Sequence, residues 1–437
     1  MHTSGKGSAV TLDRAQFSRR GFLGLGVAAG VITLTACGSG SGSSDEPLVM
    51  TVWGGETDRA TYQKRINLLV KKYPDLKVKL QLIPSDSYPQ KVQTMIAGGK
   101  GPDIMQVAEN VNVYSSKNQL RPLDDLVKSA GVDLAERFGG IGSLYSYQDK
   151  VYAIPDRSGA MIVYYNKTLF EKKGIKAPTA EWTWDDALDA FKELTSKGKT
   201  WGYGGAGWWP QWWSFAYQNG GAIIDANGKP AVDSDEVVEA LQWAGDLVFK
   251  HGVVPTKAQY ADMGTDVGGD QAFAAGTVAV NATGFWAIAG LTDTKFEWDI
   301  APMWRGEKQA VSSFGSGLAI SRTAKNPDKA FKAIDFLTSP TAQQQIIATG
   351  EDVPANLEVQ KSEAFLKPAW MKSTVDMGVF GESSSFLFKA PFIPEWNEMQ
   401  AAIDTELADF WLGKEKSAKK ALTALQKSLE SIVKPAG

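Results

Sequence analysis

Between residues 48 and 108 the apolar positions switch repeatedly between the spacing of a strand and the spacing of a helix. The runs 48–53, 78–82 and 103–108 have the length and pattern of buried strands. The segments 57–73 and 88–97 carry their apolar residues on one helical face, and each is followed by a proline or glycines. Strands and helices in this close alternation predict parallel βαβ winding, and therefore an α/β fold.

The centre of the chain has a different pattern. Two apolar runs within 150–166 flank the turn-forming segment Pro155–Gly159, and 183–197 and 234–251 predict amphipathic helices. Between those helices, residues 200–215 crowd tryptophans among glycines and a proline. We predict an irregular aromatic loop there, with tryptophans that cannot all be core residues.

The last third of the chain is mainly helical. A strand is predicted at 276–280, and glycine-containing segments at 281–284 and 315–317 read, like Pro155–Gly159, as places where the chain crosses between lobes. Helices are predicted at 327–338, 340–349, 395–411 and 415–433.

The first 47 residues carry a pattern of their own. Arg19 and Arg20 precede an uncharged run of 16 residues, 21–36, which is too short for a comfortable membrane-spanning helix. Such a run suits the apolar core of an export signal, and the arginine pair is typical of a twin-arginine signal. The residues Leu34 to Cys37 resemble a bacterial lipobox, in which the cysteine is lipidated. A buried hairpin of a cytosolic protein is the alternative interpretation.

These features predict a signal peptide over 1–36 and a lipidated flexible tether over 37–47. The tether, GSGSGSSDEP after Cys37, should span about 17 Å on average. We therefore expect the mature protein on the outer face of the cytoplasmic membrane, anchored by lipid at Cys37.

Composition narrows the functional classes. The 437 residues exceed one typical domain, so two lobes are expected. Without residues 1–36 the chain has 42 basic and 48 acidic residues, a net charge of −6, which does not favour nucleic acid. Cys37 is the only cysteine and His251 the only histidine outside the signal, so we expect no intrachain disulfide, no metal site and no cofactor.

Five sets of segments share a pattern with one known family: Gly101–Ile104, Ile162–Lys167, Gly276–Val280 with Gly284–Trp286, Ser316–Ile320 with Ala330–Leu337, and Trp411–Lys414. Together they resemble the solute-binding lipoproteins of bacterial carbohydrate ABC importers, the maltose-binding-protein-like family. The resemblance implies a periplasmic-binding-protein-like fold, with a sugar held in a cleft between two α/β lobes, and the many aromatic residues favour an oligosaccharide. It also implies a monomer that delivers sugar to the transmembrane subunits of an ABC permease, without being an enzyme.

On this fold we expect one lobe over 48–155 and 284–314, and the other over 156–283 and 315–437. Sugars present C–H faces and hydroxyls, so their sites need flat aromatic surfaces and polar side chains. Trp286 matches the position of a sugar-stacking tryptophan in the family, although it could also be a core residue.

The other candidate ligand-binding residues are aromatic or polar side chains near predicted strand ends and crossings. Arg157 could also simply pair with Asp156, and the glutamates and Asn110 could lie in solvated loops. Gly159 stands where maltose binders tend to have an acidic residue, which argues against maltose itself. The candidates are Glu56, Glu109, Asn110, Arg157, Trp208, Trp209, Trp304, Ser316 and Glu351, with Asp352 and Trp396 as weaker ones.

Two other functions remain open at this stage. One is the binding of a non-sugar solute such as a glycerol phosphodiester or a peptide, although few basic residues other than Arg157 are obvious near the predicted cleft. The other is an exported glycoside hydrolase, which would need paired carboxylates about 5–9.5 Å apart.

The lipid anchor gives the first testable prediction. Because lipidation requires the thiol of Cys37, Cys37→Ser should leave an unprocessed or soluble precursor in the fractionated host. A variant that is processed normally and still sediments with membranes would contradict the anchor.

Overall fold

The computed structural model describes residues 46–108, 111–350, 352–371, 375–388, 390–391 and 393–434. The predicted signal peptide and Cys37 lie outside the described residues, as do Glu109, Asn110 and Glu351.

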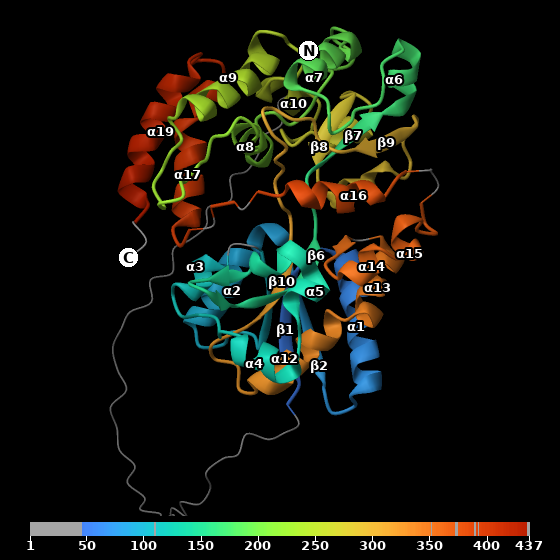
Figure 1. Cartoon of the computed structure of the whole chain (residues 1–437), viewed down its shortest axis with the longest axis vertical. Helices are drawn as coiled ribbons and strands as arrows, with labels where there is room; N and C mark the ends of the chain where they lie inside the picture. The colour runs from blue at the N-terminus through green and yellow to red at the C-terminus, as the bar shows by residue number, and fades with distance from the viewer. Residues whose placement is uncertain are drawn as a thin grey trace, which may run out of the picture. The chain divides into compact units, whose positions relative to one another are not determined.

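The first of two main sheets has six strands in the order β11-β6-β10-β3-β1-β2 (Figure 1). Strand β1 runs parallel to β2 and β3, whereas β10 runs antiparallel to β3 and β6. The predicted βαβ winding over 48–108 is therefore confirmed. The strands are β1 (Leu48–Trp53), β2 (Val78–Ile83), β3 (Ile104–Ala108), β6 (Ala153–Ser158), β10 (Ser316–Ile320) and β11 (Val353–Pro354).

Helices cover this sheet with their apolar faces. Helix α1 (Glu56–Lys72) buries Tyr62, Ile66 and Leu69 and contacts α12 (Pro327–Leu337) and α13 (Pro340–Thr349). Helix α2 (Tyr88–Ala97) lies near the same sheet (Figure 1). Burial of these apolar side chains is the main stabilising contribution expected for such a layer.

The second sheet has three antiparallel strands in the order β8-β7-β9, namely β8 (Val280–Thr283), β7 (Ile162–Asn166) and β9 (Trp298–Ala301). Thr183 and Asp186 form a reciprocal capping box at the start of α7 (Trp184–Leu194). The longer helices on this side are α7 (Trp184–Leu194), α8 (Trp209–Gln218), α9 (Asp235–Phe249), α17 (Trp396–Glu406) and α19 (Ala418–Ile432).

Shorter elements connect these layers. They are η1 (Ser85–Ser87), α3 (Asn112–Ser115), α4 (Asp124–Ala130), α5 (Leu134–Phe138), η2 (Gly139–Ser143), β4 (Ser146–Tyr147), β5 (Lys150–Val151), α6 (Lys167–Lys173), α10 (Lys257–Asp262), α11 (Asp270–Ala274), η3 (Phe285–Leu291), α14 (Leu357–Gln360), α15 (Glu363–Leu366), α16 (Gly378–Ser383), η4 (Ser384–Phe386) and α18 (Ala408–Trp411).

The strand pairing corrects the expected division of the chain. Residues 284–314 were assigned to the first lobe, but β9 within them pairs with β7 of the second sheet. Residues 315–437 were assigned to the other lobe, but β10 pairs with β3 and β6 of the first sheet. The segment 281–284 largely belongs to β8 and is therefore not a crossing, and the strand predicted at 276–280 begins only at Val280. Strand partners are set by long-range contacts that local patterns do not encode.

The predicted aromatic loop also needs correction. Trp209–Gln218 form helix α8, with Pro210 in the first turn, where its missing N–H is harmless. The proline therefore starts a helix here instead of breaking one. Trp212 and Trp213 are fully buried on this helix.

A buried ionic cluster joins α1 to β6. Asp156 accepts hydrogen bonds from Tyr62 Oη (2.7 Å) and from both terminal nitrogens of Arg65, which forms a fully buried ion pair with it. Arg65 Nη2 also donates to the carbonyl of Leu337 (2.6 Å), and Gln343 Nε2 donates to the carbonyl of Asp156 (2.8 Å). The cluster thus connects α1, β6, α12 and α13.

Within the ranges described, no helix combines the length and apolarity needed to cross a bilayer. The same residues include no group of three or more histidine, cysteine, aspartate or glutamate side chains suited to a metal ion.

Removing the charge of Asp156 should strongly destabilise the fold. Asp156→Asn leaves Arg65 buried without a counter-ion, and breaking a buried pair in this way typically costs about 3–5 kcal/mol. Urea unfolding followed by circular dichroism measures the change. Asp189→Asn, which breaks the exposed Lys192–Asp189 pair, is the matched control and should have no measurable effect. Equal stability of the two variants would show that the cluster does not support the fold.

Candidate ligand-binding site

One cavity of about 340 Å³ is lined by residues that both sheets position. Strands β1 and β3 end beside it, and β10 begins there, with Ser316 opposite Ala108 and Arg157. Ligands of open α/β sheets characteristically bind at this carboxyl edge. The lining residues are Trp53, Ala108, Arg157, Trp209, Trp286, Ser313, Phe314, Gly315, Ser316, Asp352 and Trp396.

Aromatic rings form much of the cavity wall. Trp286 meets Phe314 edge to face at 4.8 Å, and Trp209 meets Trp396 at 5.6 Å. Trp286 follows β8 at the start of η3 and is 43 % exposed, which is high for a tryptophan. Its indole Nε1–H donates to Asp270 Oδ2 at 2.9 Å, so the ring is held in place while its surface stays accessible.

Burial raises the pKa of the Asp270 carboxyl, and the hydrogen bonds from Trp286 and Asn281 act in the opposite direction. Asp270 therefore positions Trp286 from behind the cavity wall, because it does not line the cavity itself.

The first sheet supplies the polar wall. Ser316 Oγ accepts a hydrogen bond from Gln106 Nε2 (2.9 Å), and Gln106 Oε1 accepts one from the backbone N–H of Trp53 (3.1 Å). Arg157 is buried and donates from Nη1 to Asp58 Oδ1 at 2.9 Å. The Asp352 carboxylate accepts the N–H of Val353 at 2.8 Å.

The charges next to this wall do not favour an anion. Arg65 pairs with Asp156 and Arg157 pairs with Asp58, so each of these cations already has a carboxylate partner other than Asp352. Burial raises the pKa of Asp352 to about 7, Arg157 opposes the shift, and Asp58 and Asp156 add to it. A neutral ligand with hydroxyl groups fits this wall better than a phosphate.

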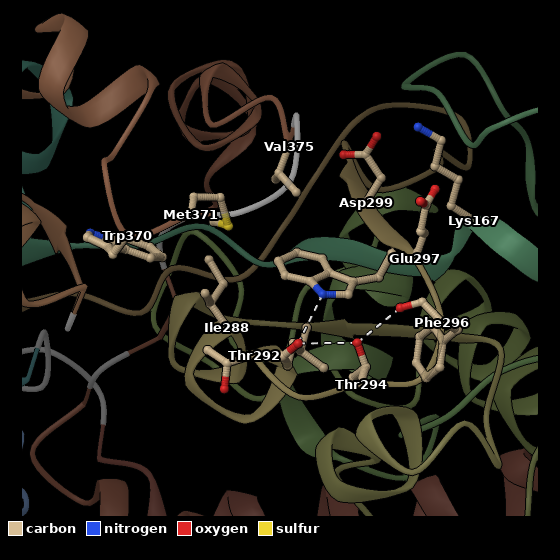
Figure 2. A pocket seen from close by; sticks show the side chains of 12 residues that line it. Lys167, Ile288, Thr292, Thr294, Phe296, Glu297, Asp299, Trp370, Met371 and Val375 are labelled. Atoms are coloured by element: carbon tan, nitrogen blue, oxygen red, sulfur yellow. Dashed lines mark hydrogen bonds between the residues drawn. The ribbon is translucent and has the colours of Figure 1, made fainter.

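A second cavity, about 410 Å³, lies beside β9 and η3 (Figure 2). The Trp298 indole N–H donates to the Leu291 carbonyl, and the Thr294 hydroxyl donates to the carbonyls of Leu291 and Phe296 (Figure 2). The polar groups of Trp298 and Thr294 are thus already engaged, and none of the residues that line this cavity comes from the first sheet. We therefore do not assign the ligand to this cavity.

Four of the predicted residues, Arg157, Trp209, Trp286 and Ser316, line the first cavity, as do the weaker candidates Asp352 and Trp396. Trp208 does not line it, but stacks on Phe314 (5.5 Å, 14°) just outside. Sequence reasoning missed five lining residues, namely Trp53, Ala108, Ser313, Phe314 and Gly315. Trp53 and Ala108 could have been predicted, because each is the last residue of a predicted strand and ligands bind at the carboxyl ends of such strands.

Two predicted residues lie elsewhere. Glu56 is the first residue of α1, is largely exposed, and pairs with Arg59 at 3.2 Å. Trp304 is fully buried against Phe191 and Tyr203, so it is a core residue and the prediction for it is wrong. Nothing in its local sequence distinguishes it from an exposed tryptophan.

Two α/β layers with a ligand-sized, aromatic and polar cavity at the sheet edge define a two-lobed periplasmic binding protein. The chain belongs to the bacterial extracellular solute-binding protein family, which it matches over residues 53–344. The fold class expected from the sequence is thereby confirmed.

Individual relatives support this assignment. An arabinooligosaccharide-binding protein of Halalkalibacterium halodurans is 25% identical over 72% of this chain and 69% of its own. A maltodextrin-binding protein of Bacillus subtilis is 24% identical over 95% of this chain and 98% of its own. Among solved structures, an ABC substrate-binding protein of Listeria monocytogenes in complex with cycloalternan has a TM-score of 0.79 and 25% identity, over 88% of this chain and 98% of that one.

The raised pKa of Asp352 predicts a pH dependence of stability. The folded protein holds the proton up to about pH 7, whereas an unfolded aspartate releases it near pH 4. The contribution of Asp352 is therefore fully present below about pH 4 and is lost as the pH rises to about 7.

Asp352→Asn should remove this part of the pH dependence. Urea unfolding at several pH values between 4 and 8 measures it, with Asp189→Asn as a surface control that keeps the wild-type profile. Identical profiles for Asp352→Asn and wild type would contradict the assignment.

Proposed function

We propose that this protein is the sugar-binding component of an ABC importer, which captures a neutral carbohydrate outside the cell and delivers it to a membrane permease. The observation that carries the proposal is the cavity itself. It combines the rings of Trp209, Trp286 and Trp396 with the polar side chains of Ser316 and Asp352. Aromatic faces match the C–H faces of a sugar ring, and the polar groups match its hydroxyls.

The same wall argues against the other two functions. A glycerol phosphodiester would require positive charge, but among the described lining residues Arg157 is the one cation, and Asp58 already pairs with it. A glycoside hydrolase would need two carboxylates across the ligand, and Asp352 is the one carboxylate among the same residues. A protein that binds a neutral sugar without catalysis accounts for these lining residues better than a phosphodiester binder or a glycoside hydrolase does.

Two adjacent crossings provide a basis for hinge closure. Between β6 and β7, Gly159 accepts a hydrogen bond from the Phe314 N–H (2.8 Å), and Met161 donates to the Ser312 carbonyl (2.9 Å). The two segments that join the sheets therefore lie side by side. Sugar contacts to both lobes would favour a closed form to the extent of its differential affinity, and the permease would recognise that form.

The location and assembly follow from the sequence. The export signal over 1–36, the lipid at Cys37 and the tether over 37–47 would hold a monomer just outside the cytoplasmic membrane. No catalytic role and no cofactor are part of this proposal.

A thermal-shift screen against a sugar panel tests the function. A ligand present at about 100 times its dissociation constant stabilises the folded state by roughly 2.7 kcal/mol. At least one mono- or oligosaccharide should raise the melting temperature, and glycerol phosphodiesters and peptides should not. A panel in which only those non-sugar solutes stabilise the protein would overturn the proposal.

Trp286→Ala should lower the affinity for that sugar at least about 50-fold. Removal of roughly 100 Å² of apolar contact costs about 2.5 kcal/mol, to which aromatic geometry adds about 0.5–1.5 kcal/mol. Isothermal titration calorimetry measures the affinity. Phe249→Ala is the matched control, because Phe249 is equally exposed, at 43 %, but lines neither the cavity nor its neighbours. Unchanged affinity in Trp286→Ala would show that this residue does not contact the sugar.

A further inference from the structure

Asp352 lies where the two lobes meet and is the one carboxylate among the described residues that line the cavity. It directly precedes β11, which pairs with β6 of the first sheet. On the other side, the phenol of Tyr164 in β7 of the second sheet is close enough for the charge of Asp352 to affect its ionisation. A charge on Asp352 therefore acts on both lobes and on whatever occupies the cavity.

The carboxyl group of Asp352 has unused hydrogen-bonding capacity. Its Oδ1 accepts the backbone N–H of Val353 at 2.8 Å. Among the described residues no other group hydrogen-bonds to this carboxyl, and the side chain is only half-buried beside the cavity. Water or a ligand in the cavity is therefore needed to complete the hydrogen bonding of this group.

The first lobe surrounds Asp352 with charges that disfavour its ionised form. Helix α1 contributes Asp58, and β6 contributes Asp156 and Arg157. Arg157 favours the carboxylate of Asp352, but it already pairs with Asp58 at 2.9 Å, and Arg65 pairs with Asp156. No described cation forms an ion pair with Asp352 itself, whereas two carboxylates repel its negative charge.

The described groups of the second lobe that face Asp352 supply no positive charge. Tyr164 is a neutral phenol, and the carboxyl of Asp270 on α11 acts on that phenol in the same direction as Asp352 does. Burial, with the two carboxylates of the first lobe, raises the pKa of Asp352 to about 7. The cavity wall therefore contains a group that changes charge near neutral pH.

A sugar in the cavity would act differently on the two forms of this carboxyl. It displaces water that stabilises a carboxylate, and being neutral it brings no counter-charge. Its hydroxyl groups can still hydrogen-bond to a protonated carboxyl, which both donates and accepts. Ionised Asp352 is therefore more costly in the complex than in the free protein, and the complex favours the protonated form.

We propose that protonation of Asp352 controls sugar affinity, so that the protein binds its sugar tightly when this carboxyl is protonated and more weakly when it is ionised. The inference rests on the proposed function and adds a regulation of the same site. A protein that works outside the cell would then capture more sugar in slightly acidic surroundings than in alkaline ones.

The test is a series of calorimetric titrations of the full mature chain between about pH 5.5 and 8.5. The probes are maltotriose, arabinotriose and whichever sugar of the panel raises the melting temperature most. Wild-type affinity should fall about tenfold from pH 6 to pH 8, because one linked proton is lost with a midpoint near pH 7. Titrations at pH 7 in two buffers of different ionisation enthalpy should show uptake of about half a proton.

Two variants assign the effect to one residue. Asp352→Asn cannot ionise, so its affinity should stay constant across this range and close to that of wild type at pH 6. His251→Gln is the matched control, because it removes the one histidine outside the predicted signal, and it should keep the wild-type profile.

Asp58→Asn provides a second test that does not alter the titrating residue. Asp58 does not line the cavity, but its charge raises the pKa of Asp352 and it pairs with Arg157, which lowers that pKa. The variant should therefore still bind sugar, with the midpoint of its affinity profile moved to lower pH. A residue that only supports the fold would not move this midpoint.

The outcomes separate this inference from the proposed function. If wild-type affinity is constant or rises from pH 6 to pH 8, or if Asp352→Asn keeps the wild-type profile, only this inference falls. An unchanged midpoint in Asp58→Asn would equally contradict it. If wild type binds no sugar of the panel at any pH, the proposed function falls and this inference falls with it.

Discussion

The arrangement of helices α1, α12 and α13 around the first sheet depends on the buried carboxylate of Asp156. A charge in this position is tolerable only because Arg65 neutralises it and Tyr62 donates a further hydrogen bond. The next residue along β6, Arg157, lines the cavity. Arg157 also contacts α1, because its Nη1 donates to Asp58 Oδ1 at 2.9 Å and its guanidinium lies 4.9 Å from the centre of the Tyr62 ring. These two consecutive residues of β6 therefore both anchor α1, and Arg157 supplies part of the cavity wall as well.

The pairing of β10 with β6 is irregular beside these two consecutive charged residues, Asp156 and Arg157. Its register shifts between Ser316 and Gly317, so that Ser316 lies opposite Arg157 and Gly317 opposite Pro155. Such an irregularity re-aims side chains at the end of a sheet, and it is common next to binding sites. Here it brings the Ser316 hydroxyl and the Arg157 guanidinium to the same cavity.

The crossings explain one unusual feature of the sequence. Gly159 stands where maltose binders tend to have an acidic residue, which by itself argues against maltose as the ligand. A Cβ at this position would lie only 3.0 Å from the carbonyl oxygen of Phe314, so a larger residue would require the paired crossing to move. The glycine is therefore also explained by close packing of two backbones, which weakens its value as a clue to the ligand.

Sequence patterns predicted the helices and strands well where local periodicity is strong, as in 48–108, 183–197 and 327–349. They failed where a long-range choice decided the outcome. β9 pairs within the second sheet and β10 within the first, the reverse of the expected assignment. An apolar strand can pair in either sheet, so its local sequence does not decide between them. Around Pro210 the proline and glycines suggested a loop, whereas burial of Trp212 and Trp213 favours a helix.

The tryptophans show most clearly what the sequence leaves open. Trp286 and Trp304 both lie in apolar, polar-flanked stretches, yet one is 43 % exposed and the other fully enclosed. The difference comes from their surroundings in space. Three aromatic residues, Phe191, Tyr203 and Phe215, surround Trp304, whereas the Asp270 carboxylate holds the edge of Trp286 and leaves its surface accessible.

This arrangement has a consequence for how a ligand would act. The aromatic surfaces of Trp209, Trp286 and Trp396 come from elements around the second sheet, whereas Arg157 and Ser316 belong to the first. A sugar that stacks on one set gains its full hydrogen bonding only when the other set is within reach. Its affinity for the closed form then exceeds its affinity for the open form, and that difference, with no chemical step, is sufficient to couple binding to closure.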